Sequence, residues 1–395
     1  MSGAAGDGGS TGQGGFVRSR LGAFRRSRAI SDAAFSLGVS VVAVLVALAI
    51  SIGVIAAFGG PPWASLHALW TGAFGGRSQI AGTLNKMIPL LLVALGWIVA
   101  FSTKRINIGF EGQILVGGIA AVVVGLKVHA PAPIPLALGV IAGIGAGGIY
   151  AAIPAWLWAR RHVNEIISTL MLNFVAIQLV SWLVRGPLQE PTRGFPFTSP
   201  VLNAARWPAL LHGTDLHWDF AVALAMAFAV QFLLKRTSFG MRLRVTGGNE
   251  PAARSAGIRT RAVAVVALVL SGMVAGLAGT SLILAGATGT MTDSFSANYG
   301  FDGIVAALLA RNSALGAIPA ALLLAALRQG GGVMEAQVGT SSALVQITQG
   351  LVVVLVAGSG WLIYRRRSVR VDTDAPAVAR GPERPEPTAA EAVVG

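Results

Sequence analysis

The chain has no cysteine, and charged residues make up only 12% of its 395 positions. Without cysteine there is no disulfide framework, Cys-ligated zinc, iron–sulfur cluster or thiol nucleophile. A phosphate-binding loop needs Gly-Lys followed by Ser or Thr, and none of the lysines stands in that context. The histidines form no His-Glu-x-x-His pair of the metalloprotease kind. The sequence therefore argues against ATP hydrolysis, thiol chemistry or zinc-protease chemistry on this chain.

Apolar residues dominate instead, at 54% of the chain, with 51 glycines and a mean hydropathy of +0.69. These values exceed those of water-soluble domains, and each membrane-spanning helix needs about 20 apolar residues. We therefore predict an all-α polytopic membrane protein, with one transmembrane domain over residues 35–365, about ten transmembrane segments and both termini cytoplasmic. The expected segments are 37–58, 87–101, 109–128, 136–158, 163–184, 220–234, 263–285, 301–310, 315–327 and 344–364.

The net charge of +14 raises the question of nucleic-acid binding. With both termini inside, most of the 30 Lys and Arg residues fall in the predicted cytoplasmic segments. This distribution follows the positive-inside rule, by which basic residues remain on the cytoplasmic side of a membrane protein. We attribute the charge to orientation in the cell membrane and to contact with anionic lipid headgroups, and we expect no nucleic-acid partner.

The segments outside the spans differ in composition. Residues 1–34 and 366–395 carry too few apolar groups to fold, which predicts a disordered basic cytoplasmic N-terminus and a disordered cytoplasmic tail. The external loop 185–219 is rich in proline and aromatic residues, so it could form a structured rim for a soluble partner or simply connect two spans. The cytoplasmic loop 235–262 contains Gly248-Asn-Glu-Pro-Ala-Ala-Arg-Ser-Ala-Gly257, a small-residue helical segment that could dock on a partner.

Polar residues within the predicted spans are informative, because each is costly in a bilayer unless it is paired or faces a cavity. Glu165, Thr169 and Asn173 recur every four residues and therefore share one helix face, which should point inward. Asn107 and Glu111 show the same spacing. With the neighbouring Gln113 and Asn164, these residues could line a pathway or form hydrogen bonds between helices.

The stretch from Gly300 to Gly316 contains two apolar pieces, 301–310 and 315–327, that are both too short to cross a bilayer. Paired short segments of this kind are typical of the broken or re-entrant helices at transporter binding sites. Asp302 lies near the outer end of the first piece and could cap it. Arg311 and Asn312 would lie at the cytoplasmic tip, in contact with either a partner or the substrate.

Four stretches together resemble the permease subunits of ABC importers. They are Ile106-Asn-Ile-Gly-Phe-Glu-Gly-Gln113, Val163-Asn-Glu-Ile-Ile-Ser-Thr-Leu-Met-Leu-Asn173, Gly248-Asn-Glu-Pro-Ala-Ala-Arg-Ser-Ala-Gly-Ile258 and Gly300-Phe-Asp-Gly-Ile-Val-Ala-Ala-Leu-Leu-Ala-Arg-Asn312. The resemblance covers residues 35–365. It is to the branch that serves ribose-type sugars, branched-chain amino acids and nucleosides, with the second stretch most similar to nucleoside permeases.

The resemblance implies how the chain is energised. The family's coupling loop carries Glu-Ala-Ala-x-x-x-Gly, to which Glu250, Ala252, Ala253 and Gly257 are similar, although Pro251 is inserted after the glutamate. Pro251 fits the first turn of a helix, where its missing N–H is not needed. By resemblance this helix docks on an ABC ATPase subunit, which binds ATP and Mg, so the chain itself is no enzyme and binds no cofactor directly. The other implied partners are a second permease subunit, with a heterodimer favoured, and an extracellular substrate-binding lipoprotein.

The resemblance also implies nucleoside import by alternating access. Import of ribose-type sugars by the same machinery is the alternative. An ion-coupled secondary transporter is a further one, in which Glu111, Glu165 and Asp302 would bind protons or sodium. The residues expected along the translocation pathway are Asn107, Glu111, Gln113, Asn164, Glu165, Thr169, Asn173, Phe301 and Asp302, while Arg311 and Asn312 serve either coupling or the pathway.

Overall fold

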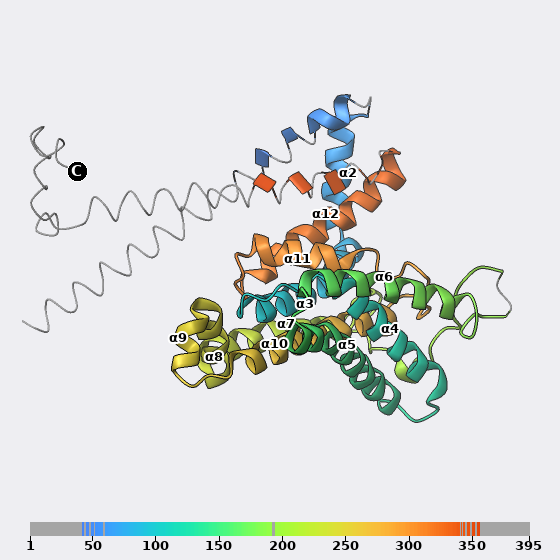
Figure 1. Ribbon diagram of the computed structural model, residues 1–395. Coiled ribbons are helices and arrows are strands. Elements are labelled where there is room, and N and C mark those ends of the chain that lie inside the picture. Colours follow the sequence, from blue (N-terminus) through green and yellow to red (C-terminus); the bar gives the residue numbers. More distant parts are fainter. Residues whose placement is uncertain are drawn as a thin grey trace, which may run out of the picture. The chain divides into compact units, whose positions relative to one another are not determined.

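The computed structural model describes residues 60–191 and 194–339, with scattered positions between 42 and 57 and between 341 and 355 (Figure 1). The predicted span 344–364 falls largely outside the described residues, and so does half of the predicted span 37–58. So do the predicted tails, 1–34 and 366–395. The elements below all belong to one compact unit, Ala49–Val353.

Every element named within the described ranges is a helix, accompanied by isolated β-bridges in the loop segments. Short loops join most of the helices, and the longest connection runs from the end of α6 to the start of α7. The elements are α2 (Pro62–Phe74), α3 (Arg77–Phe101), α4 (Phe110–Lys127), α5 (Ile134–Arg161), α6 (Glu165–Val184), η1 (Asn203–Ala205), α7 (Asp219–Arg236), α8 (Ser238–Gly248), α9 (Glu250–Ser255), α10 (Thr260–Leu284), α11 (Tyr299–Leu309) and α12 (Ala317–Val338).

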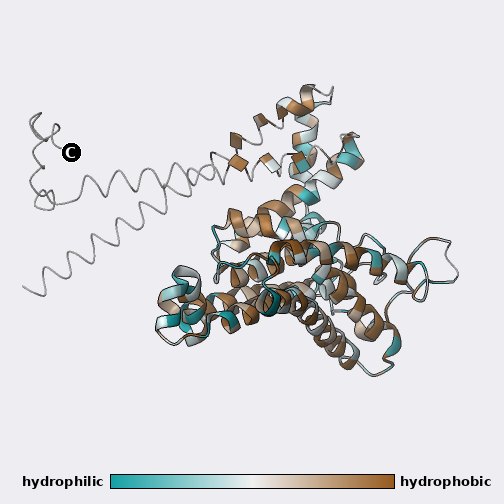
Figure 2. Cartoon of the chain, in the orientation of Figure 1, coloured by the Kyte–Doolittle hydropathy of each residue, from teal (hydrophilic) through white to brown (hydrophobic). Residues whose placement is uncertain are grey.

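Six of these helices are long and apolar enough to cross a membrane: α3, α4, α5, α6, α10 and α12. A seventh candidate is the pair α7 and α8, which is bent by 72° between its two helices. Figure 2 shows hydrophobic colouring along the long helices and hydrophilic colouring concentrated on α8 and α9. The chain is therefore a polytopic α-helical membrane protein.

Two predicted boundaries are wrong. The expected short segment 315–327 is the first part of α12, a helix of 22 residues that is long enough to span. Arg328 and Gln329 interrupt the apolar run without ending the helix, because helix formation depends on backbone bonding as well as hydropathy. For the same reason α3 begins at Arg77, ten residues before the predicted start, and continues through Lys86. The other predicted short segment is confirmed, since α11 has only 11 residues.

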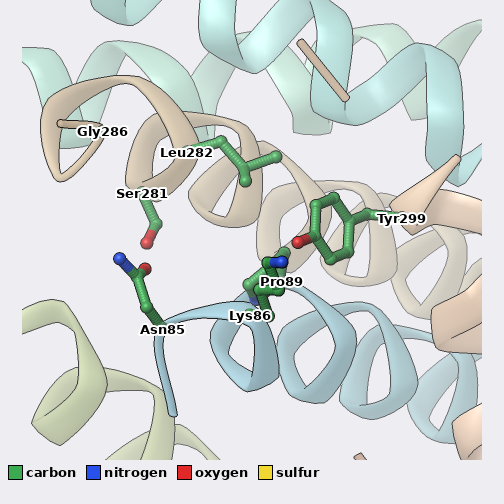
Figure 3. A pocket seen from close by; sticks show the side chains of 7 residues that line it. All are labelled: Asn85, Lys86, Pro89, Ser281, Leu282, Gly286 and Tyr299. Atoms are coloured by element: carbon green, nitrogen blue, oxygen red, sulfur yellow. The ribbon is translucent and has the colours of Figure 1, made fainter. Parts of the chain in front are cut away.

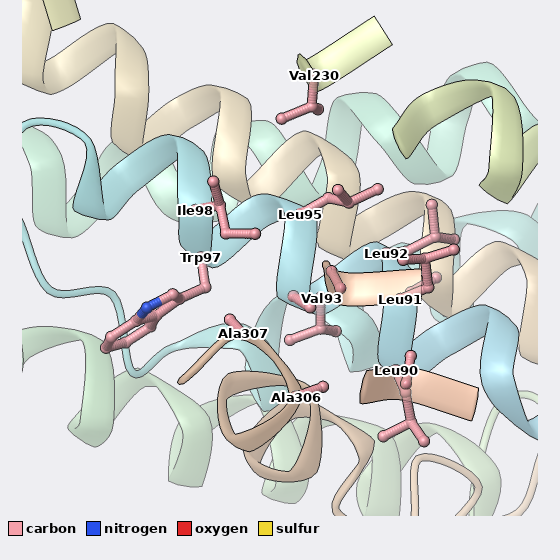
Figure 4. Close-up of a cluster of buried hydrophobic side chains, with 14 of the residues drawn as sticks. Leu90, Leu91, Leu92, Val93, Leu95, Trp97, Ile98, Val230, Ala306 and Ala307 are labelled. Atoms are coloured by element: carbon pink, nitrogen blue, oxygen red, sulfur yellow. The ribbon is translucent and has the colours of Figure 1, made fainter. Parts of the chain in front are cut away.

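The centre of the unit is α3, which is apolar on every side from Met87 onward. A helix that is hydrophobic all round is usually buried, because no face favours water. Figure 4 shows its leucines and Val93 among side chains from other helices, with Val230 contributed by α7 and Ala306 and Ala307 by α11. Burial of α3 thus holds together segments that lie more than 200 residues apart in the sequence.

Close approach of α4, α5 and α10 depends on glycine. Gly276 of α10 lies against Gly117 of α4 and Gly147 of α5. A Cβ added to Gly117 would come within 2.5 Å of the Gly276 Cα, and one added to Gly147 would come within 2.7 Å. Small residues of this kind allow helix backbones to pack closely in membranes, where dispersion replaces the hydrophobic effect as the driving force. This three-helix contact positions the polar residues described next.

Candidate functional site

The predicted docking segment forms a short capped helix, α9. The side-chain oxygen of Asn249 accepts a hydrogen bond of 3.1 Å from the backbone N–H of Ala252, and Pro251 occupies the first turn. The expectation that Pro251 fits there is confirmed. Beyond the helix, Gly257 has a φ of +77°, a left-handed conformation that glycine adopts at little cost. The inserted proline and the glycine thus fix the two ends of α9.

The four residues of the coupling pattern play different parts in this helix. Ala253 is fully buried on the inner side of α9, whereas Ala252 and Gly257 are exposed. The exposed surface of α9 therefore consists of small side chains and the Arg254 side chain, which is 64% exposed. This surface, formed by Pro251, Ala252, Arg254, Ser255, Ala256 and Gly257, is called the α9 face below.

Glu250 is turned toward its own chain. One carboxylate oxygen accepts hydrogen bonds from Arg254 at 2.6 Å and from the Thr260 hydroxyl at 3.2 Å, and the other lies 3.6 Å from Arg105. The Arg254 hydrogen bond is the main reason that the pKa of Glu250 is lowered. Thr260 and the charges of both arginines act in the same direction, while partial burial opposes them. Glu250 therefore anchors α9 as an anion.

Helices α8 and α9 lie at one end of the bundle, where α3 and α5 end and α6 and α10 begin. This end is called the α9 end below. Gly247 of α8 packs directly on the backbone carbonyl of Ser102, just beyond α3, and leaves no room for a side chain at position 247. The elements on either side of α9 carry exposed arginines, two in α8 and two at the start of α10: Arg242, Arg244, Arg259 and Arg261.

From the α9 end, the chain runs into the bundle as an extended stretch before α4 begins. Non-helical backbone at membrane depth needs partners for its polar groups. Asn107 supplies several: its amide donates to Ser271 of α10 at 2.8 Å and to Gln113 at 3.1 Å, and its oxygen accepts from the N–H of Gly109 at 2.9 Å. Ser271 lies 11 residues into α10, or about 16 Å from its start at 1.5 Å per residue.

The polar face of α6 bonds the same stretch. Thr169 accepts from the N–H of Ile108 at 3.2 Å. Asn173 accepts from the N–H of Gly112 at 2.8 Å and donates to the carbonyl of Ile108 at 2.9 Å. The prediction that Glu165, Thr169 and Asn173 share an inward face is confirmed, and the bonds show why that face is polar.

The carboxylate of Glu111 closes the start of α11. It accepts hydrogen bonds from the N–H groups of Asn298 at 3.2 Å and Gly300 at 2.8 Å. An anion is favourable there because the N–H groups at a helix start have no partner within the helix. The expectation that Asp302 caps this helix is wrong, since Asp302 instead forms an ion pair of 2.8 Å with Arg328 of α12. Glu111, approaching from α4, occupies the capping position.

The remaining predicted residues lie apart from this cluster. Asn164 caps α6 by accepting from the N–H of Ile166 at 2.8 Å, and Glu165 pairs with Arg105 at 3.4 Å, both at the α9 end. Phe301 is 38% exposed on α11. Asn312 accepts a 3.0 Å hydrogen bond from the Trp97 indole, and both it and Arg311 adopt positive φ in the turn before α12.

A small cavity lies near the opposite end of α3. Its volume is about 170 Å³, and Figure 3 shows Lys86 and the Tyr299 hydroxyl directed toward one another in its lining. The sequence offers one signal for it, since Lys86 stands directly before the predicted span 87–101. The full lining is Asn85, Lys86, Pro89, Ser281, Leu282, Gly286 and Tyr299. Among the described residues, no group of three or more His, Asp and Glu side chains is placed to hold a metal ion.

Comparison of the sequence with known proteins identifies the family. Residues 79–357 match the family described as the permease component of the branched-chain amino acid transport system. The chain belongs to this family. The permease is a multi-pass protein of the cell membrane and a transport component of ABC importers.

Among curated relatives, the permease is 35% identical over 357 residues to the glucose ABC transporter permease protein TsgB13 of Haloferax volcanii. The aligned residues cover 87% of this chain and 94% of TsgB13. It is 34% identical to the guanosine ABC transporter permease protein NupP of Bacillus subtilis, over 74% and 84% of the two chains. It is 29% identical to the nucleoside ABC transporter permease protein NupB of Lactococcus lactis, over 69% and 78%.

Proposed function

We propose that this permease moves nucleosides across the cell membrane by alternating access, driven by a separate ATPase subunit that docks on the α9 face. The observation that carries the docking part is the geometry of α9. A helix of six residues is too short to be stable alone. Here it is capped at its start, ended by a glycine in the left-handed conformation, and anchored through Glu250 and buried Ala253.

The α9 face suits a protein partner because its exposed side chains are small. Small residues allow a partner's surface to approach the helix backbone, and the four exposed arginines of the adjacent elements favour acidic groups on that partner. We propose that the partner binds ATP and Mg, since the permease sequence contains no phosphate-binding loop. The complete importer would add a second, different permease subunit and an extracellular substrate-binding lipoprotein.

Nucleosides are the cargo that two of the three relatives support, since NupP and NupB are named for guanosine and nucleosides. The sequence from Val163 to Asn173, which resembles nucleoside permeases, supports the same cargo. Simple sugars are a second candidate, favoured by the similarity to the glucose permease TsgB13 over 94% of that chain. Both cargoes present several hydroxyl groups, so polar side chains that make weak hydrogen bonds would serve either one.

The hydrogen bonds within the chain support a division among the pathway residues. Asn107, Gln113, Thr169 and Asn173 are buried, and their partners are backbone groups or other side chains of the bundle. We propose that these residues hold the extended stretch in place and keep the pathway in shape. The residues proposed to touch cargo are those that retain exposed surface and lie outside the Arg105 ion pair, namely Asn164, Phe301 and Asp302.

An ion-coupled mechanism finds less support. Each of its candidate carboxylates already has donors within the chain: Glu111 has two backbone N–H groups, Glu165 has Arg105 and Asp302 has Arg328. Sodium or proton binding would compete with all of these contacts. Dependence of uptake on ATP, with no response to an ionophore that collapses the membrane potential, separates the two mechanisms.

The deciding experiment is uptake of radiolabelled guanosine and uridine by cells with and without this gene, competed with excess ribose, glucose or branched-chain amino acids. Loss of nucleoside uptake in the deletion strain, with no competition by the sugars in the parent, is the expected result. Intact nucleoside uptake together with loss of glucose or ribose uptake would overturn the nucleoside assignment and support the sugar alternative.

A further inference from the structure

One guanidinium group joins three helices at the α9 end. Nitrogens of Arg105 lie 3.4 Å from a carboxylate oxygen of Glu165 at the start of α6 and 3.6 Å from one of Glu250 in α9. The same guanidinium stacks over the Trp158 ring near the end of α5, with 4.3 Å between the guanidinium carbon and the ring centroid. Arg105 itself belongs to none of these helices, because it lies in the connection between α3 and α4.

On the α9 side, two further contacts tie this group to the docking segment. Glu250 is shared, since its second oxygen bonds Arg254 and Thr260, which links α9 to the start of α10. The backbone of α8 at Gly247 rests on the turn at Ser102 and Thr103, and Thr103 lies two residues before Arg105. A displacement of α8 and α9 therefore reaches Arg105 both through an ion pair and through backbone packing.

On the other side, Arg105 directly precedes the extended stretch 106–109. The backbone of Ile108 in that stretch is hydrogen bonded to both Thr169 and Asn173 of α6, and Asn107 is bonded to α10. Arg105 therefore contacts α6 directly at Glu165 and indirectly through the stretch that it begins. A movement at Arg105 would be passed to α4 and α6 together.

The contacts of Arg105 contribute little to the stability of the fold, and they can rearrange when the helices move. Ion pairs that are partly exposed contribute little to folding, and the side chains of Arg105, Glu165 and Glu250 are 23%, 14% and 31% exposed. The Nε atom of Arg105 is buried and has no hydrogen-bond partner in the described structure. Because a guanidinium presents five donors in a planar fork, it can shift between two carboxylates without losing both.

We propose that Arg105 is the positioning residue that transmits movement of α9 to α6 and to the start of α4. The proposal rests on the proposed docking of an ATPase subunit on the α9 face, and it adds the route by which that docking reaches the membrane helices. Arg105 touches neither ATP nor cargo. Its role is to make α9 and the cytoplasmic ends of α5 and α6 move as one body.

The test uses the complete importer in liposomes, comprising the permease, its ATPase and second permease subunits and the binding protein. Three quantities are measured: the amount of ATPase subunit that co-purifies, basal ATP hydrolysis, and import of guanosine or glucose, whichever the wild type transports. The variants are Arg105→Gln, Arg105→Lys, Glu165→Gln and the double variant Arg105→Gln/Glu165→Gln. Arg185→Gln is the matched control, because it removes the 2.6 Å ion pair with Asp293 away from α9.

Arg105→Gln is expected to keep its ATPase subunit and basal hydrolysis but to lose roughly five- to tenfold in import, a typical coupling factor between two sites. Arg105→Lys should recover part of the lost import, because lysine restores the positive charge but not the planar guanidinium that can bond both carboxylates. The double variant should be no worse than Arg105→Gln, since residues that act through one contact are not additive. Arg185→Gln should import normally.

Normal import by Arg105→Gln would overturn the proposal. A parallel loss of bound ATPase subunit and import would also overturn it, because Arg105 would then serve docking or folding. Additive losses in the double variant would show that Arg105 and Glu165 act separately, which is a third contrary result. Failure of the wild-type complex to bind an ATPase subunit at all would instead reject the proposed function, and is seen before any variant is made.

Discussion

The carboxylate of Glu111 accepts a 2.8 Å hydrogen bond from the backbone N–H of Gly300, which lies 189 residues further along the chain. One acidic side chain in α4 thus provides the cap that α11 lacks within its own sequence. The contact also joins two of the four stretches by which the sequence resembles ABC permeases.

Glu111→Ala should destabilise the permease by about 1.5–3 kcal/mol, the usual range for a hydrogen bond to a charged group. Glu111→Gln should cost less, because its amide oxygen can still accept one of the two bonds. Thermal unfolding of the purified permease in detergent measures both changes. Glu335→Ala is the control, since Glu335 is an exposed acidic residue of α12 and its removal should leave the melting temperature unchanged. An equally stable Glu111→Ala variant would show that the cap is unimportant.

Gly276→Ala should destabilise the bundle by about 1–3 kcal/mol, the typical cost of overpacking. The added methyl group would meet the backbone of Gly143 and Gly147 and push α5 away from α10. Gly145→Ala offers a matched control within α5, because nothing lies within 4 Å of a Cβ at that position. The melting temperatures of the two variants in detergent should differ clearly, and similar values would contradict the packing argument.

Glu250→Arg should lower cargo uptake by about tenfold and leave the permease folded, because the change disturbs α9 at the end of the bundle and not the membrane core. The new cation would face Arg105 and Arg254 and repel both. Uptake is compared with the wild type at equal membrane expression. Unchanged uptake would reject a role for this end of α9 in coupling.

The absence of cysteine allows a direct test of the α9 face, because an introduced thiol is unique in the chain. Ala252→Cys should react readily with a maleimide in the isolated permease and be protected once the ATPase subunit is bound. Ala253→Cys, one residue away but buried, should react slowly in both states. Thr288→Cys is exposed elsewhere and should react equally in both. Equal labelling of Ala252→Cys with and without the ATPase subunit would contradict docking there.

The lowered pKa of Glu250 predicts a specific pH response. A carboxyl group with a lowered pKa in the folded state stabilises that state fully above its ordinary pKa, and this contribution is lost as the pH falls through the lowered value. Hydrogen exchange of the α9 amides should therefore be slow at neutral pH and accelerate, after correction for intrinsic rates, only in acid below the usual carboxyl range.

Glu250→Gln supplies the control for this response. Its side chain cannot ionise, so α9 should exchange faster at neutral pH and show little further change on acidification. The same acid-dependent acceleration in wild type and Glu250→Gln would mean that another group controls α9.

The sequence predicted which residues matter better than it predicted their contacts. The four-residue spacing of Glu165, Thr169 and Asn173 was sufficient to place them on one inward face, because helix geometry fixes that relation. The same spacing could not show that the face bonds an extended backbone stretch. Nothing in the sequence distinguishes Arg105 from the other basic residues between predicted spans, since its three partners are brought together by helices far apart in the sequence.

Composition and hydropathy by themselves determined that this chain is a helical membrane protein, because spanning a bilayer requires long apolar helices whatever their arrangement. Local sequence also determined the start and end of α9, through Asn249, Pro251 and Gly257, since capping depends on neighbouring residues only. Tertiary structure alone decided that Glu111 caps α11 and that Arg105 joins α9 to α6. Both contacts depend on groups meeting across distant segments, and such meetings are fixed by the packing of the whole bundle.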